Sequence, residues 1–400
     1  MRRSALNVVK TVGVAAAMLL MAGAACAKPA PAPAPAPKPA TGEPVLVGHY
    51  GSLTGPEATF GQSTSNGIKL AIEEINAAGG VNGRPLVLKE YDTAGKPDET
   101  KVAVERLVKS DNVNVVFGEV ASSLSLVGAP VCQAAGVPMI TPSSTNTKVT
   151  EVGDYIFRAC FIDPFQGLAG AKFAREELKA KTAAVLVEQS SAYAVGLAEK
   201  FSENFKKMGG TVATQQEYSK GAQDFTAQLA NIRTAKVDVI YIPGYYTDVG
   251  NIAQQARKLG LNQPLLGGDG WDSEMLAKIG KTAIEGCYYT NHYAPDQPEA
   301  RVKQFIASYK KKFDSVPDGL AALGYDAAKM YAAAANKAGT VDKKAVRDAL
   351  AATKGFPGVT GNITMNAQRD AVKSAVVVEM ALDEKTKRLE PRFVKAVSPE

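Results

Sequence analysis

The sequence predicts an α/β protein of two Rossmann-like lobes, each built on a parallel sheet. Short apolar segments alternate with longer ones whose apolar residues recur every three or four positions, as in strands alternating with helices. The strand segments are apolar throughout, which is typical of strands covered on both faces. The pattern restarts near Thr182, and the 400-residue chain is too long for one comfortable core.

The first lobe is predicted from strands that alternate with helices. Its expected strands are Val45–Gly51, Pro85–Tyr91, Val113–Gly118 and Pro138–Thr141. The helix after the first strand places Ile68, Ala71, Ile72 and Ile75 on one face and stops at Gly79 and Gly80. The next helix begins at the capping residue Asp98, and a third begins at Ser125.

The second lobe is predicted in the middle of the chain. Its expected strands are Thr182–Glu188, Val237–Ile242 and Pro264–Gly267, with a helix after each of the first two. Three long helices follow without strands between them: Ala300–Phe313, Leu320–Ala338 and Lys343–Ala352. They need a sheet to cover, and we expect the first lobe to supply it. The tail is expected to form a strand pair, Ser374–Leu382 and Arg392–Val397.

The N-terminal residues 1–27 have the order of a secretory signal peptide. Three basic residues precede the apolar run Val12–Met21, which is short for a membrane span, and small residues follow. Two cleavage modes stay open. Ala25-Cys26-Ala27 fits ordinary signal peptidase, whereas Gly23–Cys26 resembles a lipoprotein box and would make Cys26 a lipidated residue, which we favour. Residues 28–44 alternate Ala and Pro and predict an extended spacer or a tail without function.

The composition excludes several classes of function. The formal net charge of +6 falls to +3 without residues 1–27, which hold three basic and no acidic residues, and no Lys/Arg block occurs, so no nucleic-acid partner is expected. No second long apolar run follows Val45, and we expect a soluble body with at most a lipid anchor on a membrane. The two histidines, His49 and His292, and the cysteine spacing predict no metal and no cofactor.

The cysteines leave one disulfide to consider. Cys132 ends a helical stretch and Cys160 follows the expected strand Tyr155–Ala159. An exported protein can hold a disulfide, and these two could pair if their elements are neighbours in one sheet. Cys287 would then be a lone buried thiol.

The candidate ligand site lies where the strands end. In open parallel sheets, ligands bind beyond the carboxyl ends of the strands. The loops of the first lobe there carry hydroxyls next to helix starts, a setting that favours a carboxylate: Ser122, Ser143, Ser144 and Thr145. The loops of the second lobe carry Tyr193, Tyr245 and Asp269, which could hold an ammonium group. Capping and turn formation explain each residue singly, but their coincidence at successive strand ends favours a zwitterion site.

Six segments carry a resemblance to a known family. They are GSLTGPEATFGQ (51–62), GIKLAIEEINAAGGVNGRPL (67–86), PMITPSSTN (138–146), FRACFIDPFQG (157–167), GYYTDVGNIAQQARKLGL (244–261) and GGDGWDS (267–273). In this order the chain resembles the branched-chain amino-acid binding proteins of ABC transporters, which have the type I periplasmic binding fold. The resemblance covers Val45 to the C-terminus and implies three crossings between lobes, near Asp163, His292 and Val372. The lobes would then be 45–163 with 293–372, and 164–292 with 373–400.

The resemblance also implies roles for individual residues. Ser122 and Thr145 match hydroxyls that bind the ligand carboxylate, and backbone groups at Ser143 and Ser144 would help hold both ends of the amino acid. Tyr193 and Tyr245 match aromatic residues that close over the ligand, Phe60 an aromatic wall and Asp269 the acidic group that receives the ammonium. Two departures stand out: Asp269 is shorter than the usual glutamate, and Trp271 replaces a small residue and is expected to reshape the side-chain pocket. The family's loop disulfide is absent, since Ala94 and Ala121 replace its partners.

The function implied by the resemblance is solute capture rather than catalysis. We expect a periplasmic monomer that closes on a small amino acid, with leucine, isoleucine or valine as the default, and delivers it to an ABC permease. No GxSxG, GxxxxGK[ST] or strand-linked GxGxxG motif suggests an enzyme. The alternative is a stand-alone sensor of amides or small carboxylates with the same fold.

Overall fold

The computed structural model describes residues 40–399. The predicted signal peptide, Cys26 and the first part of the predicted spacer lie outside these residues. The last residues of the spacer are packed: the backbone N–H groups of Thr41 and Gly42 donate to the carbonyl of Gly83, at 3.2 and 3.1 Å. Among the described residues, no helix combines the length and apolarity needed to cross a membrane.

The first sheet has five parallel strands in the order β2-β1-β3-β4-β5. Its strands are β1 (Val45–Gly51), β2 (Leu86–Asp92), β3 (Val115–Phe117), β4 (Met139–Thr141) and β5 (Ile156–Arg158). The helices between them are α1 (Ala58–Ala77), α2 (Pro97–Glu105), α3 (Ser122–Ala135) and the short α4 (Lys148–Glu151). All four predicted strands of this lobe are confirmed, within two residues at each end.

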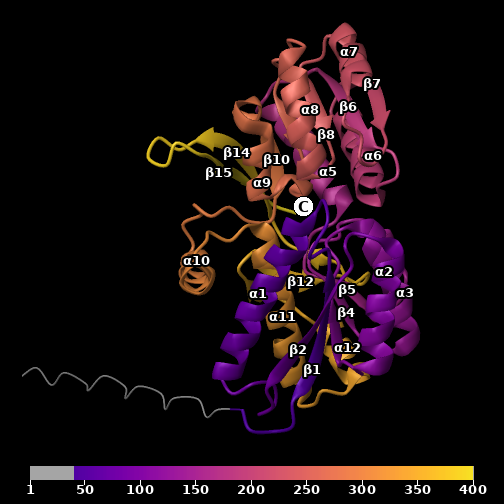
Figure 1. Ribbon diagram of the computed structural model, residues 1–400, viewed down its shortest axis with the longest axis vertical. Coiled ribbons are helices and arrows are strands. Elements are labelled where there is room, and N and C mark those ends of the chain that lie inside the picture. The colour runs from indigo at the N-terminus through magenta and orange to yellow at the C-terminus, as the bar shows by residue number, and fades with distance from the viewer. Residues whose placement is uncertain (1–39, 400) are drawn as a thin grey trace, which may run out of the picture. The chain divides into compact units, whose positions relative to one another are not determined.

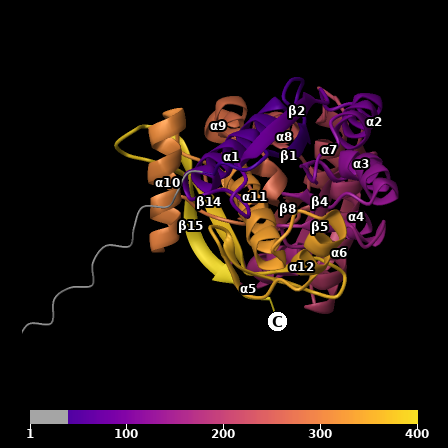
Figure 2. The ribbon, with the colours of Figure 1, turned by 90° about the horizontal axis from the view of Figure 1, so that it is seen from below.

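The faces of this sheet are covered by different helices. Along β3, Val115 and Phe117 belong to one apolar cluster and Val116 to another, because successive side chains of a strand point to opposite faces. Figures 1 and 2 show α1 on one side of the sheet and α2 with α3 on the other. A parallel sheet buried on both faces explains why its strands are uniformly apolar.

The second sheet has seven strands in the order β15-β14-β10-β9-β8-β6-β7. Its parallel strands are β6 (Thr182–Glu188), β7 (Thr211–Tyr218), β8 (Val239–Ile242), β9 (Leu265–Gly267) and β10 (Tyr288–Asn291). The strands β14 (Ala375–Leu382) and β15 (Leu389–Val397) add an antiparallel edge. Its helices are α5 (Asp163–Glu176), α6 (Ala192–Lys207), α7 (Thr226–Ala235), α8 (Tyr246–Lys258) and α9 (Glu274–Gly280). The strands β7 and β10 were not predicted.

The three helices that lack intervening strands are α10 (Ala300–Phe313), α11 (Gly319–Ala338) and α12 (Lys343–Ala351). As expected, α11 packs on α1 and on β3 of the five-stranded sheet, and α12 packs on α11. A small antiparallel sheet that was not predicted follows, made of β11 (Phe356–Gly358), β12 (Gly361–Met365) and β13 (Ala371–Val372). The expectations of three crossings and of the lobe limits stay predictions.

The predicted disulfide between Cys132 and Cys160 is wrong. Both are free, buried thiols, as is Cys287. Cys132 packs with Val116 on one face of the five-stranded sheet, whereas Cys160 packs with Val115 on the other. The sheet therefore separates the two sulfurs. Burial raises the pKa of Cys160 to about 12, so its thiol stays protonated.

Candidate functional site

The hydroxyl-rich loop after β4 is held from beneath by a buried arginine. Arg158, the last residue of β5, is fully buried and donates to the carbonyls of Ser144 and Asn146. Its guanidinium also lies 2.7 Å from a carboxylate oxygen of Asp370. A guanidinium fixes several acceptors at once through its planar fork, so Arg158 sets the shape of the loop that carries Ser143, Ser144 and Thr145.

A buried glutamate ties three strand-end loops of the first sheet together. The carboxylate of Glu119 accepts from the backbone N–H of Ser52 at 2.9 Å and from its hydroxyl at 2.7 Å. Its backbone carbonyl accepts from the hydroxyls of Thr141 and Ser144, at 2.6 and 3.0 Å. Burial raises the pKa of Glu119. The loops after β1, β3 and β4 are thus joined through one residue.

The hydroxyl groups predicted to bind the ligand differ in whether they already form hydrogen bonds within the protein. Ser144 donates within the protein, to the carbonyl of Val120 at 2.9 Å, so its side chain is committed to the loop. Ser122, the first residue of α3, accepts from the backbone N–H of Asn146 at 3.4 Å. The buried Thr145 Oγ1 has no hydrogen-bond partner among the described residues. The hydroxyl of Thr145 therefore has no short hydrogen bond that fixes it, although it lies close enough to the buried carboxyl of Asp163 to lower the pKa of that group.

The predicted aromatic residues of the second sheet meet one another and reach the first sheet. The rings of Tyr193 and Tyr245 stack with centroids 5.4 Å apart, and Tyr245 packs against Phe60 of α1 in a T-shaped pair with centroids 5.3 Å apart. The Tyr193 hydroxyl accepts from the backbone N–H of Gly270 at 3.1 Å. Tyr193 and Phe60 are buried, and Tyr245 is half-buried. These three rings form one apolar wall across the two sets of loops.

Asp269 lies at the meeting point of the two sets of loops. One carboxylate oxygen accepts from the amide of Gln166 at 2.9 Å, and the other lies 3.0 Å from Nε2 of His292 and accepts from Ser143 at 3.3 Å. Burial lowers the pKa of His292 to about 4, so its imidazole is neutral near pH 7. Asp269 is therefore close to the serine loop, as predicted, but already has several protein partners.

Trp271 lies in the hydrophobic core. Its ring is fully buried, its indole N–H donates to the carbonyl of Ile242 at 2.9 Å, and it packs in the core cluster that also holds Ile252 and Leu276. An indole in this position stabilises the seven-stranded sheet. The expectation that Trp271 reshapes a ligand pocket stays a prediction.

The two sets of strand-end loops also contact each other directly outside the predicted site. Asn146 donates to the carbonyl of Ala192 at 2.7 Å, and the N–H of Ala192 donates to Ser123 at 3.0 Å. On the other side, the hydroxyls of Thr59 and Ser273 lie 2.9 Å apart. The loops are therefore closed on each other in this structure, with the predicted residues buried between them.

The contacts of several residues in this region were not predicted from the sequence. Gln166 and His292 contact Asp269, and Arg158 shapes the serine loop. Asp163 begins α5 and is buried, with the hydroxyl of Thr145 beside its carboxyl. Burial, and secondarily the charge of Asp269, raises the pKa of Asp163 to about 7. The sequence does hold one signal for two of these residues: Arg158 and Asp163 are the only charged residues in the otherwise apolar stretch FRACFIDPF, and a charge in such a stretch is unusual.

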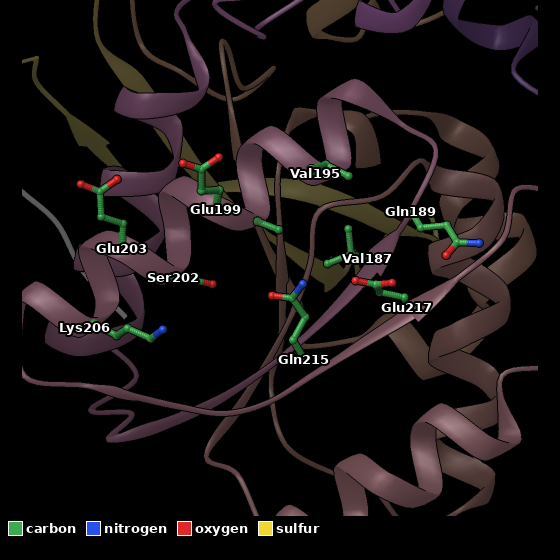
Figure 3. A pocket seen from close by; sticks show the side chains of 10 residues that line it. Val187, Gln189, Val195, Glu199, Ser202, Glu203, Lys206, Gln215 and Glu217 are labelled. Atoms are coloured by element: carbon green, nitrogen blue, oxygen red, sulfur yellow. The ribbon is translucent and has the colours of Figure 1, made fainter.

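A surface groove of about 870 Å³ lies elsewhere, between α6 and the edge strand β7. Figure 3 shows Glu199, Glu203 and Lys206 of α6 near Gln215 and Glu217. None of the predicted site residues lines it. Within residues 40–399, no group of three or more His, Cys, Asp or Glu side chains is arranged to hold a metal ion.

Comparison with known proteins agrees with this architecture. The family model described as periplasmic binding protein matches residues 44–384. The chain belongs to this family. Its members are substrate-binding proteins of transporters rather than enzymes, and the family implies an extracytoplasmic location. The predicted resemblance and the type I fold are thereby confirmed.

Relatives with described ligands are similar over most of the chain. A leucine-, isoleucine-, valine-, threonine- and alanine-binding protein of Pseudomonas aeruginosa is 34% identical, with 80% of this chain and 85% of the relative covered. A leucine-binding protein of Thermotoga maritima is 36% identical with a TM-score of 0.84, covering 89% of this chain and 99% of that one. A Streptococcus pneumoniae branched-chain amino-acid binding protein, solved with isoleucine, has 31% identity, a TM-score of 0.81, and coverage of 88% and 99%.

One structural relative binds a different class of ligand. A solute-binding protein of Rhodopseudomonas palustris, solved with 3,4-dihydroxybenzoic acid, is 26% identical with a TM-score of 0.79, and 89% of this chain and 97% of that chain are covered. A structural relative of this chain therefore binds a carboxylate that carries no ammonium group.

Proposed function

We propose that this protein captures a branched-chain amino acid between its two sets of strand-end loops and delivers it to the permease of an ABC importer. The observation that carries the proposal is the approach of Ser143 to Asp269 at 3.3 Å, beside the wall of Phe60, Tyr193 and Tyr245. A polar pair from opposite loops next to an apolar wall suits a small amphipathic ligand. The relatives that bind leucine, isoleucine and valine support this ligand class.

In this proposal each set of loops holds one end of the ligand. Ser122, Thr145 and the backbone N–H groups of the serine loop take the carboxylate, because helix starts and free donors favour anions. Asp269 binds the ammonium, and this new contact replaces its present hydrogen bond with Ser143. The aromatic wall contacts the aliphatic side chain, and closure of the loops produces the shape that a permease distinguishes from the open form.

A second candidate is capture of a small carboxylate that has no ammonium. Asp269 already has hydrogen bonds with Gln166, Ser143 and the neutral His292, so a ligand ammonium is not needed to satisfy the hydrogen-bonding capacity of its oxygens. The dihydroxybenzoate-binding relative supports this alternative. Such a protein would serve an importer of aromatic acids or act as a stand-alone sensor.

A thermal-shift screen decides between the two candidates. The panel contains the twenty amino acids, small amides, 4-hydroxybenzoate and 3,4-dihydroxybenzoate, each far above its expected dissociation constant. A ligand at a hundredfold excess over that constant stabilises the folded state by about 2.7 kcal/mol. We expect leucine, isoleucine and valine to raise Tm. A shift with the benzoates alone would reject the amino-acid proposal in favour of the second candidate.

We further propose that the chain is exported as a monomer and anchored through a lipid on Cys26. The basic, apolar and small residues of 1–27 support export, and the Ala-Pro spacer would hold the body away from a membrane surface. Labelling with a radioactive fatty acid tests the anchor. Incorporation that is lost in Cys26→Ala supports it, whereas no incorporation indicates ordinary secretion.

A further inference from the structure

A second cavity lies where the chain passes between β10, the small sheet and β14. It has a volume of about 320 Å³ and is lined by residues of three chain segments, 292–302, 359–362 and 372–376, and by the C-terminal Ala396 and Pro399. None of the serine, threonine or tyrosine residues predicted to bind the ligand lines it. Pockets for organic ligands start at about this size, so the space suits a small solute.

A buried lysine without a carboxylate partner lines this cavity. Lys373 is 2% exposed, and its ammonium donates to the hydroxyl of Thr360 and to the carbonyl of Ala159 at 3.4 Å. No carboxylate of the described residues lies within ion-pair distance of its ammonium. Burial lowers the pKa of Lys373 to about 8. An ammonium held in this way costs desolvation free energy that a bound anion would offset.

A second cation lines the same cavity. Arg301 of α10 donates to the side-chain oxygen of Asn362 at 2.8 Å, and no carboxylate of residues 40–399 forms an ion pair with its guanidinium. Arg301 and Lys373 line the same cavity, and the buried carboxylate of Asp326 favours the charged form of Lys373 more than Arg301 disfavours it. Two cationic side chains that line one cavity and have no ion-pair partner favour the binding of an anion in that cavity.

Two carboxylates near the cavity, Asp326 and Glu299, have other surroundings. Asp326 accepts from the backbone N–H groups of Val359 and Thr360 and from the hydroxyl of Thr360, so its oxygens are occupied by the loop. Glu299 lines the cavity but belongs to its exposed rim, where water screens its charge. The charged side chains that line the interior of the cavity are therefore Lys373 and Arg301, with Asp326 linked to Lys373 through the hydroxyl of Thr360.

The cavity shares one side chain with the proposed ligand site. His292 lines the cavity, its Nε2 lies 3.0 Å from Asp269, and its ring stacks on Phe161 with centroids 3.7 Å apart. Its Nδ1 is buried and has no partner among the described residues. A solute in the cavity therefore lies one imidazole away from Asp269.

We propose that this cavity is a second ligand site that binds a compact oxyanion. Inorganic phosphate and small carboxylates share the required chemistry, which is a charged oxygen that can accept from Lys373 and Arg301 together. Oxyanions also suit Arg301 better than halide ions do, because a guanidinium offers parallel donors to two oxygens. The site does not depend on which solute the cleft takes.

Calorimetric titration of the full chain with inorganic phosphate, and separately with acetate, tests the site. Ionic strength is held constant with sodium chloride so that an oxyanion is distinguished from chloride. We expect saturable binding of one of the two anions, weakened at least about tenfold in Arg301→Gln and in Lys373→Met. The control Lys206→Met removes the same charge from the groove of α6 and should bind as the unaltered protein does.

Three outcomes overturn the proposal. They are no saturable binding of either anion, unchanged affinity in Arg301→Gln, and equal weakening in Lys206→Met, which would indicate a general charge effect. Arg301 is only half-buried, so Arg301→Gln keeps the test valid if Lys373→Met fails to fold. Titration of Arg301→Gln with leucine separates this result from the proposed function, because leucine affinity does not require the cavity.

Discussion

The two sets of strand-end loops that meet at the proposed ligand site are built differently. The loops of the five-stranded sheet are fixed from inside by buried charges, Arg158 and Glu119, which hold backbone groups. The loops of the seven-stranded sheet contribute stacked rings and Asp269, whose partners come partly from the other loops. The first set is therefore held mainly by residues of its own sheet, whereas Asp269 of the second set also depends on a contact from the first. Stability should therefore depend most on the first set and ligand discrimination most on the second.

The largest expected effect is at Arg158. Arg158→Met leaves Asp370 buried without its cation and removes the donors to the serine loop, which should cost about 3–5 kcal/mol of unfolding free energy. Urea denaturation measures it. The double variant Arg158→Met with Asp370→Leu should recover part of the loss, because no unpaired charge remains. Lys207→Met, which removes an exposed ion pair with Glu203, should change stability little. Equal effects at Arg158 and Lys207 would contradict the part of Arg158 in holding the serine loop.

The next effect concerns pH and Asp163, where the two sets of loops adjoin. Its pKa is raised from 3.8 to about 7, so the unfolded chain ionises at lower pH than the folded protein does. The carboxyl therefore destabilises the fold increasingly between pH 4 and 7, by up to about 1.4 kcal/mol for each pH unit. Asp163→Asn should gain stability over the unaltered protein across that window, with no further gain above it. A difference in unfolding free energy that is constant from pH 4.5 to 7.5 would reject this.

A smaller effect is expected in the aromatic wall. Tyr193→Phe removes the acceptor of the buried Gly270 N–H, which should cost about 1–3 kcal/mol. The matched control is Tyr241→Phe, since the buried hydroxyl of Tyr241 has no partner among the described residues. Thermal unfolding of both variants measures the difference. If Tyr241→Phe destabilised the protein as much, the Gly270 contact would have no special part in placing the second set of loops.

Reductant is expected to have no effect on the thermal stability of the protein. Cys132 and Cys160 are free thiols on opposite faces of the five-stranded sheet. Dithiothreitol should leave Tm unchanged. Both cysteines should take up iodoacetamide in denaturant without reductant, as peptide mass spectrometry reads out. A Tm that falls with reductant, or a peptide pair linked at these cysteines, would show that they pair in solution.

Local pattern was sufficient to predict most of the fold. The buried parallel strands are apolar runs, and the long helices carry clear 3.6-residue periodicity, so both could be read directly. The strand β7 was missed because, as an edge strand, it alternates polar residues in the segment TVATQQEY. The small sheet was missed because β13 has only two residues and no pattern of its own.

The sequence predicted that several of the candidate residues lie close together, but not the contacts that support them, and their role as a ligand site stays a prediction. The strand-end rule located the hydroxyls, the tyrosines and Asp269, because it depends only on chain order along a parallel sheet. The pairing of Arg158 with Asp370 joins residues more than 200 positions apart, and no local pattern encodes it. The partners of Asp269 and the core position of Trp271 likewise follow from tertiary packing. The disulfide prediction was wrong because sequence spacing does not say which face of a sheet a residue occupies.

The central claim is that each set of loops holds one end of an amino acid, and titration calorimetry with ligands lacking one end tests it most directly. Leucine binding should be weakened in Thr145→Val and in Asp269→Asn, but not in Asp272→Asn, whose carboxylate bonds Tyr289 and Asn291 within the fold. Leucinamide lacks the carboxylate, so its affinity should be the same in Thr145→Val as in the unaltered protein. N-acetyl-leucine lacks the ammonium, so its affinity should not change in Asp269→Asn. Leucine binding that is unchanged in Asp269→Asn would contradict the claim.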